Sequence, residues 1–126
     1  MSRLSKELHD LRPLMAAAAQ MVYEEWEQDE EGVDEELGSG GICDQVSQAI
    51  AEVISRNVSD VKTFDGGAEG DDHAWTVAQA DGEAYGIDIP PGVYETGGGY
   101  NWKRRKDVQI LPGHVVIFPV PLQDVE

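Results

Sequence analysis

Residues 39–50 read SGGICDQVSQAI and combine a glycine pair, a cysteine and the start of an apolar pattern of helical spacing. The pair Gly40 and Gly41 lets the backbone turn sharply just before Cys43, the only cysteine of the chain. After Cys43, apolar residues recur at three- and four-residue spacing, which predicts an amphipathic helix with one buried face. The residues of that face are Val46, Ala49, Ile50, Val53 and Ile54.

A thiol at the start of a helix is chemically special. It lies beside unpaired backbone N–H groups and the positive end of the helix dipole. Both favour the nucleophilic thiolate, and the same N–H groups can hold a developing oxyanion. Cys43 is therefore a candidate nucleophile. The alternative is that Cys43 is a small buried hydrophobic residue, the commoner role of a lone cysteine.

The composition limits the class of protein. The chain has 126 residues, which predicts a single domain over 1–126. Its formal charge of −16 disfavours nucleic-acid partners and anionic membranes. A single cysteine forms no internal disulfide, and the N-terminus lacks an apolar targeting segment. We therefore expect a soluble, cytoplasmic protein.

The N-terminal part, residues 1–28, carries an apolar stripe of helical spacing. Pro13 removes a backbone donor and restricts Arg12, so we expect a short first helix and a second one from Pro13 to about Glu27. Nine of the thirteen residues 24–36 are acidic, which is typical of a solvated connector, with a surface for a basic partner as the alternative. Together with the glycines of 38–41, this pattern predicts an acidic, glycine-rich connector over 29–41.

The remainder, residues 42–126, switches from helical to strand-like patterns. The cysteine helix should end near Asn57, and residues 58–64 favour a strand. Asp81-Gly82 is the strongest hairpin signal and joins strands over 73–80 and 83–89. Two short strands, 108–111 and 114–120, are expected around a turn at Pro112-Gly113. Helices followed by an antiparallel meander predict an α+β fold, with the cysteine helix packed on a small antiparallel sheet.

A nucleophilic cysteine needs a base and a third group that orients the base. In a two-residue hairpin at Asp81-Gly82, paired positions sum to 163, so Trp75 opposes Asp88. Asp88 then lies within a diagonal step of His73, on the same face of the sheet. An aspartate at that range can bind one imidazole nitrogen and leave the other for the thiol. The pattern predicts Cys43, His73 and Asp88 as a catalytic triad, whereas the alternative for Asp88 is a turn-proximal acid or a surface pair.

Two other histidines compete for the role of base. His114 precedes a buried-looking strand but has no acidic residue near it in the sequence, so we interpret it as a strand-entry histidine. His9 lies among solvent-facing residues of the first helix, so we interpret it as a surface histidine.

Three short motifs occur in this order: Gly41-Ile42-Cys43 before a helix, His73-Ala74-Trp75 opening a strand, and residues 86–90 (GIDIP) closing the hairpin. Over roughly residues 40–90 they resemble the transglutaminase-like branch of the papain-like cysteine protease superfamily. The resemblance implies a papain-like core in which Cys43 is the nucleophile, His73 the general base and acid, and Asp88 the residue that orients His73.

The chain also departs from that pattern. Papain-type enzymes carry an oxyanion glutamine several residues before the cysteine, where this chain has Leu37 and Gly38; the nearest upstream glutamine is Gln28. The NlpC/P60 cell-wall peptidases have an aspartate beside the cysteine, as Asp44 is here. That likeness would assign the histidine to His114, but the match with Cys43, His73 and Asp88 is better.

Other stretches carry weaker signals. Asp65, Asp71, Asp72 and His73 could ligate a metal but lack a fixed ligand spacing, so neither a metal nor a cofactor is predicted. Residues 97–99 are three glycines followed by Tyr100-Asn101-Trp102, which is typical of a loop that could cover the site, with an ordinary flexible loop as the alternative.

The sequence thus favours a small cysteine-dependent hydrolase or acyl transferase that acts on an amide or ester, with a protein or peptide as the expected substrate. The alternative is an acidic, non-enzymatic binding or inhibitor protein, or an inactive member of the family, that meets a basic partner.

Overall fold

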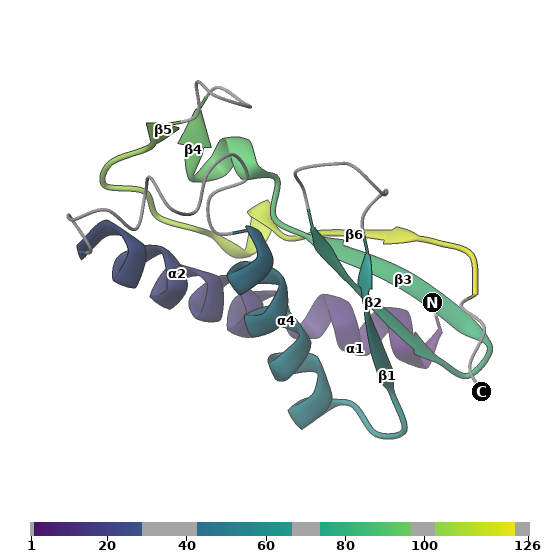
Figure 1. The fold of residues 1–126 in the computed structure, drawn as a ribbon. Coiled ribbons are helices and arrows are strands. Elements are labelled where there is room, and N and C mark those ends of the chain that lie inside the picture. The colour runs from purple at the N-terminus through teal and green to yellow at the C-terminus, as the bar shows by residue number, and fades with distance from the viewer. Residues whose placement is uncertain (1, 29–42, 67–73, 97–102, 123–126) are drawn as a thin grey trace.

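The computed structural model describes residues 2–28, 43–66, 74–96 and 103–122. Within these residues, helices come first and an antiparallel sheet follows, which confirms the α+β class (Figure 1). The helices are α1 (Arg3–Asp10), α2 (Arg12–Gln28) and α4 (Cys43–Asn57). The strands are β1 (Lys62–Gly66), β2 (Trp75–Ala80), β3 (Glu83–Asp88), β4 (Glu95–Thr96), β5 (Lys103–Arg104) and β6 (Val116–Pro119). Two 3₁₀ turns, η1 (Pro91–Val93) and η3 (Pro112–His114), complete the described elements.

The main sheet has the strand order β1-β2-β3-β6, and each neighbouring pair is antiparallel. β4 and β5 form a separate two-stranded ladder. In the sequence, this ladder lies between β3 and β6. Helix α4 packs against β2 and β1, and in Figure 1 the helices lie on one side of the sheet. The cysteine helix is therefore packed on a small antiparallel sheet, as the sequence predicts.

Pro13 divides the N-terminal apolar stripe into two helices, as expected. α1 ends at Asp10, Leu11 forms its C-cap, and α2 begins at Arg12 with Pro13 in its first turn. The missing N–H of a proline causes no loss at this position, because the first-turn N–H groups of a helix have no partner within the helix.

The hairpin between β2 and β3 has the predicted turn and register. Asp81 has φ 55° and Gly82 has φ 75°, both left-handed values, which is the backbone of a type I′ turn. The paired residues run from Ala80 with Glu83 to Thr76 with Ile87, and the residue numbers of each pair sum to 163. The observed register is the one that a two-residue turn at Asp81-Gly82 requires.

The two strands expected at 58–64 and 108–111 differ in the structure. The N–H of Val58 still bonds the carbonyl of Ile54 at 2.9 Å, and Asp60 turns the chain at φ 57°, so β1 starts only at Lys62. Residues 108–111 form no strand, because the side chain of Gln20 takes their backbone groups. Its amide Nε2 donates to Val108 O at 3.1 Å, and its Oε1 accepts from Ile110 N at 2.7 Å.

The core lies between the helices and one face of the sheet. Val46, Ile50 and Ile54 of the predicted face of α4 are buried, whereas Val53 is only partly buried. The core also holds the fully buried side chains Leu4, Leu8, Met15, Tyr23, Ile87, Ile89 and Tyr94.

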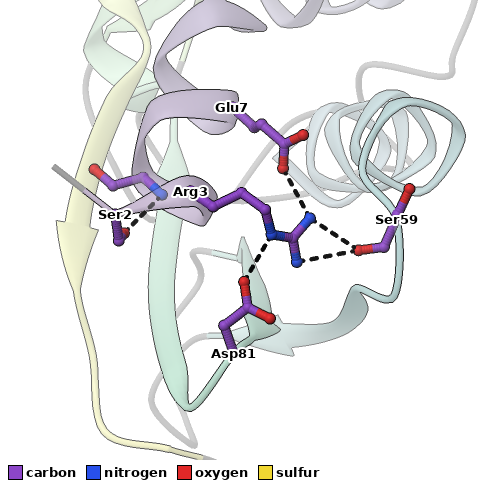
Figure 2. A network of polar contacts seen from close by, with 6 residues as sticks. Ser2, Arg3, Glu7, Ser59 and Asp81 are labelled. Atoms are coloured by element: carbon purple, nitrogen blue, oxygen red, sulfur yellow. Dashed lines mark hydrogen bonds and ion pairs between the residues drawn. The ribbon is translucent and has the colours of Figure 1, made fainter.

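A polar network around Arg3 ties the N-terminus to the hairpin (Figure 2). Arg3 Nε donates to Asp81 Oδ2 at 2.7 Å, and its Nη1 donates to Glu7 Oε2 at 3.1 Å. The two Nη atoms also reach Ser59 O at 3.3 and 3.4 Å. One guanidinium therefore connects α1, the segment after α4 and the turn between β2 and β3.

No helix among the described residues is long and apolar enough to cross a membrane.

The Arg3 network predicts a shift in the titration of Asp81. The hydrogen bond from Arg3 lowers the pKa of Asp81, desolvation opposes this, and the charge of Arg3 adds to the lowering. Because the folded-state pKa lies below the unfolded one, the contact stabilises the fold above the unfolded pKa. This stabilisation is lost as the pH falls through the folded pKa, below about pH 4.

We expect Arg3→Gln to raise the pKa of Asp81 towards its ordinary range, as measured by NMR titration of the side-chain carboxyl carbon. Arg56→Gln removes the same charge from an exposed arginine that pairs with Glu52, and should leave Asp81 unchanged. Equal Asp81 midpoints in the wild-type and Arg3→Gln proteins would show that the contact does not form in solution.

Candidate functional site

Cys43 is the first residue of α4, so its backbone lies where the sequence predicts, at the N-terminus of the amphipathic helix. Asp44 is in the same first turn and is exposed. The side chain of Cys43 and the whole of His73 lie outside the described residues, as do Asp71, Asp72, the glycines 97–99 and Trp102. The geometry of the site is therefore built from the residues that flank them.

A buried hydrogen-bonded pair attaches α4, which begins at Cys43, to β2. Ser47 lies one helical turn after Cys43, and Thr76 lies three residues after His73. Thr76 Oγ1 donates to Ser47 O at 2.7 Å, and the two hydroxyl oxygens are 2.9 Å apart. Each hydroxyl has one proton, so Ser47 Oγ donates to Thr76 Oγ1. Ser47 is 4% exposed and Thr76 is 1% exposed, so both bonds are shielded from water.

This pair sets the level at which α4 begins relative to the sheet. Four residues separate the end of α4 from β1, whose first residue Lys62 pairs with Gln79, so α4 and β2 run in the same direction. A helix rises about 1.5 Å per residue, which puts the backbone of Cys43 about 6 Å beyond Ser47. A strand covers that distance in about two residues. With the axes of α4 and β2 parallel, these rises correspond to Cys43 at about the level of Ala74, the chain neighbour of His73.

Asp88 is the last residue of β3 and is half-buried. It pairs with Val116 of β6, and one further step of the hairpin register sets it opposite Trp75. Ile87 is fully buried and pairs with Thr76, whose side chain meets α4. Since side chains alternate along a strand, Asp88 projects to the sheet face opposite α4. Asp88 and the start of α4 consequently share one end of the sheet, and any contact between them must form around that end.

An aromatic surface lies beside Asp88 on the same face of the sheet. The rings of Trp75 and Phe118 are 6.2 Å apart between centroids, with an interplanar angle of 67°. The ring of Trp75 covers Gly66 and the ring of Phe118 covers Gly86, so that a side chain at either glycine would overlap the ring. This close approach requires glycine at both positions and gives the face next to Asp88 a continuous aromatic wall.

The rings of the two other histidines bond backbone groups three or four positions away in the sequence. His114 and Leu111 bond one another: His114 N donates to Leu111 O, and Leu111 N donates to His114 Nδ1, each at 2.9 Å. The ring thus closes η3 and does not open a strand, because β6 begins only at Val116. His9 Nδ1 lies 2.7 Å from Ser5 O and donates to it, so His9 is half-buried against its own helix. The hydrogen bonds of both histidine rings therefore support local backbone structure.

Among the described parts of the chain, no three His, Cys, Asp or Glu residues gather as a metal site. Sequence reasoning missed Ser47 and Thr76. The signal was present in the sequence: a serine between apolar positions of the buried face of α4, and a threonine on the helix-facing side of β2.

Comparisons with known proteins do not add to this geometry. No protein-family model matches the chain, and searches of the curated proteins and of the solved structures return no match either. The functional inference accordingly depends on the fold and the residues just described.

The Ser47–Thr76 pair should be coupled energetically. Thr76→Val leaves Ser47 Oγ without its buried acceptor, and we expect a loss of about 1–3 kcal/mol in the free energy of unfolding. Ser47→Ala should cost a similar amount, but the double variant should cost clearly less than the sum, because neither partner is then left unsatisfied.

The measurement is urea unfolding followed by circular dichroism. Thr63→Val is the matched control, because Thr63 is only half-buried in β1, and its loss should be smaller. Strict additivity of the two substitutions would contradict the hydrogen bond.

Proposed function

We propose that the protein is a small cysteine-dependent hydrolase or acyl transferase with a papain-like core, in which Cys43 is the nucleophile, His73 the general base and acid, and Asp88 the residue that orients His73. The observation that carries the proposal is the buried bond between Ser47 and Thr76. It attaches the first turns of α4, which begins at Cys43, to the second residue of β2, three positions after His73 in the sequence. The hairpin register then brings Asp88 to the same end of the sheet.

The proposed chemistry uses an amide or an ester, with a protein or peptide as the proposed substrate. His73 takes the proton of the Cys43 thiol, and the thiolate sulfur attacks the carbonyl carbon. The carbon–nitrogen or carbon–oxygen bond then breaks, His73 protonates the leaving group, and a thioester remains. Water or an amine attacks the thioester, which releases the acid or a new amide and returns the proton to sulfur. The unpaired N–H groups in the first turn of α4 favour the thiolate and can stabilise the oxyanion.

The aromatic wall supports an acyl substrate at this end of the sheet. Trp75 and Phe118 offer apolar surface beside Asp88, and a peptide side chain can pack on it. The substrate would then approach from the face opposite α4, while the thiol approaches from the N-terminus of α4. This arrangement agrees with catalytic groups that meet around the end of the sheet.

The alkylation rate of Cys43 tests the proposal without a known substrate. Cys43 is the only cysteine, so reaction with iodoacetamide reports on one site. We expect a rate-against-pH profile with a midpoint well below the ordinary thiol pKa of about 8.5, because an imidazolium partner stabilises the thiolate. His73→Ala should move the midpoint back towards about 8.5, and Asp88→Asn should have a smaller effect of the same sign.

His114→Ala is the control and should leave the midpoint of Cys43 unchanged, because the ring of His114 serves η3. An ordinary midpoint in both the wild-type and His73→Ala proteins would remove the enzymatic proposal. A midpoint that responds to His114 and ignores His73 would transfer the role of base to His114, in an NlpC/P60-like arrangement.

A second candidate function is binding to a basic protein partner, and a groove between α2 and α4 favours it. The groove has a volume of about 490 Å³, and Leu14 and Met21 on its wall are 51% and 64% exposed. Glu25 and Glu52 line it as well, together with Arg56, which pairs with Glu52. A second copy of this chain would bring another charge of −16, so charge complementarity favours a cationic amphipathic helix as the occupant.

A leucine- and lysine-rich helical peptide with a fluorescent label tests this second candidate by anisotropy. Met21→Gln should weaken binding about tenfold, because burying a methionine contributes about 1.5 kcal/mol or more. Leu111→Gln removes another exposed apolar side chain, 53% exposed and outside the groove, and should leave binding unchanged. Unchanged binding in both variants would mean that the peptide is held only by the net charge.

A further inference from the structure

A cleft of about 540 Å³ opens between η1 and the segment after β5. Gly92 and Val93 of η1 form one side, while Arg105 and Lys106 line the other, and His114 also contributes. η1 begins three residues after Asp88 in the chain. The volume lies within the range of small-molecule sites in proteins.

Arg105 is held in place far more firmly than an ordinary surface arginine. Its backbone N donates to Tyr94 O at 2.8 Å, and its backbone O accepts a hydrogen bond from the hydroxyl of Tyr23 in α2. Its Nε donates to Gly92 O at 2.9 Å across the cleft. These bonds fix both the main chain and the plane of the guanidinium, and they leave the two Nη groups for a ligand.

The charge of the cleft is opposite to that of the whole chain. The protein carries −16, yet Lys103, Arg104, Arg105 and Lys106 are consecutive cations. In the described part of the chain, the ion pairs are made by Arg3 and Arg56, and neither Arg105 nor Lys106 takes part in one. Two cations without carboxylate partners at the mouth of a cleft favour a negatively charged ligand.

His114 can supply a further donor. Its Nδ1 accepts the N–H of Leu111, so the proton of the neutral ring is on Nε2. The ring is half-buried and lines the cleft, which makes Nε2–H a hydrogen-bond donor that η3 does not use.

We propose that this cleft is an oxyanion-binding site for a small molecule with a carboxylate or phosphate group. Arg105 binds two oxygens of the group through its Nη atoms, Lys106 adds a second positive charge, and His114 donates from Nε2. A planar guanidinium fork matches both carboxylate and phosphate, whereas the lysine acts as a point charge. The site is independent of the proposed triad, because binding requires no reaction at Cys43.

Two probes at constant ionic strength test the site on the full chain: inorganic phosphate and succinate, followed by ¹⁵N–¹H NMR shifts. We expect saturable shifts around Gly92, Val93, Arg105, Lys106 and His114 with at least one probe, and the tighter probe identifies the preferred oxyanion. Arg105→Gln should weaken binding at least about tenfold, since a charged hydrogen bond is lost. Arg105→Lys should restore only part of the affinity.

Arg56→Gln is the matched control, because it changes the net charge by the same amount on a different element. Lys106→Gln is the second variant if Arg105→Gln does not fold. No hydrogen bond of Lys106 to the described chain is present, and its loss should weaken binding several-fold. The proposal is overturned by the absence of saturable shifts with both probes, or by an Arg56→Gln protein that loses as much affinity as the Arg105→Gln protein.

Discussion

The hydrogen bonds between Ser47 and Thr76 fix how the helical layer meets the sheet. An apolar interface alone would let α4 slide along β2, because dispersion and hydrophobic contacts have little directional preference. Two buried hydroxyls that satisfy one another accept only one alignment, since any slip would leave both without partners in a dry environment. The position of the N-terminus of α4, and therefore of any chemistry at Cys43, depends on that alignment.

Elements encoded by local chemistry could be predicted from the sequence. Pro13 separates α1 from α2, and Asp81-Gly82 sets the hairpin register, because each acts through its own backbone angles and the next few residues. The segment 108–111 could not be predicted in this way. Its apolar residues suit a strand, but a glutamine almost ninety positions earlier takes its backbone hydrogen bonds, and no local pattern encodes such a partner.

The same distinction between local patterns and long-range contacts applies to the candidate site. Spacing and register were sufficient to assign Cys43 to a helix start and Asp88 to the end of β3, which pairs with β2. No pattern in the sequence indicates which face of the sheet α4 covers, so the placement of Asp88 and α4 on opposite faces could not be predicted. The sequence also did not reveal the fixed guanidinium of Arg105, because Tyr23, Gly92 and Tyr94, which hold it, are far away in the sequence.

The Arg3 network has a consequence for the order in which parts of the chain can fold during translation. Arg3 lies 78 positions before its partner Asp81, and 56 positions before Ser59. A polypeptide leaves the ribosome N-terminus first, so α1 is exposed well before the hairpin turn that anchors it has been translated. Leu4 and Leu8 are fully buried in the folded protein, so their side chains are not completely covered until the sheet has formed. α1 is thus held in place only after the hairpin turn, 78 positions later, has been made, and until then its leucine face lacks part of its cover.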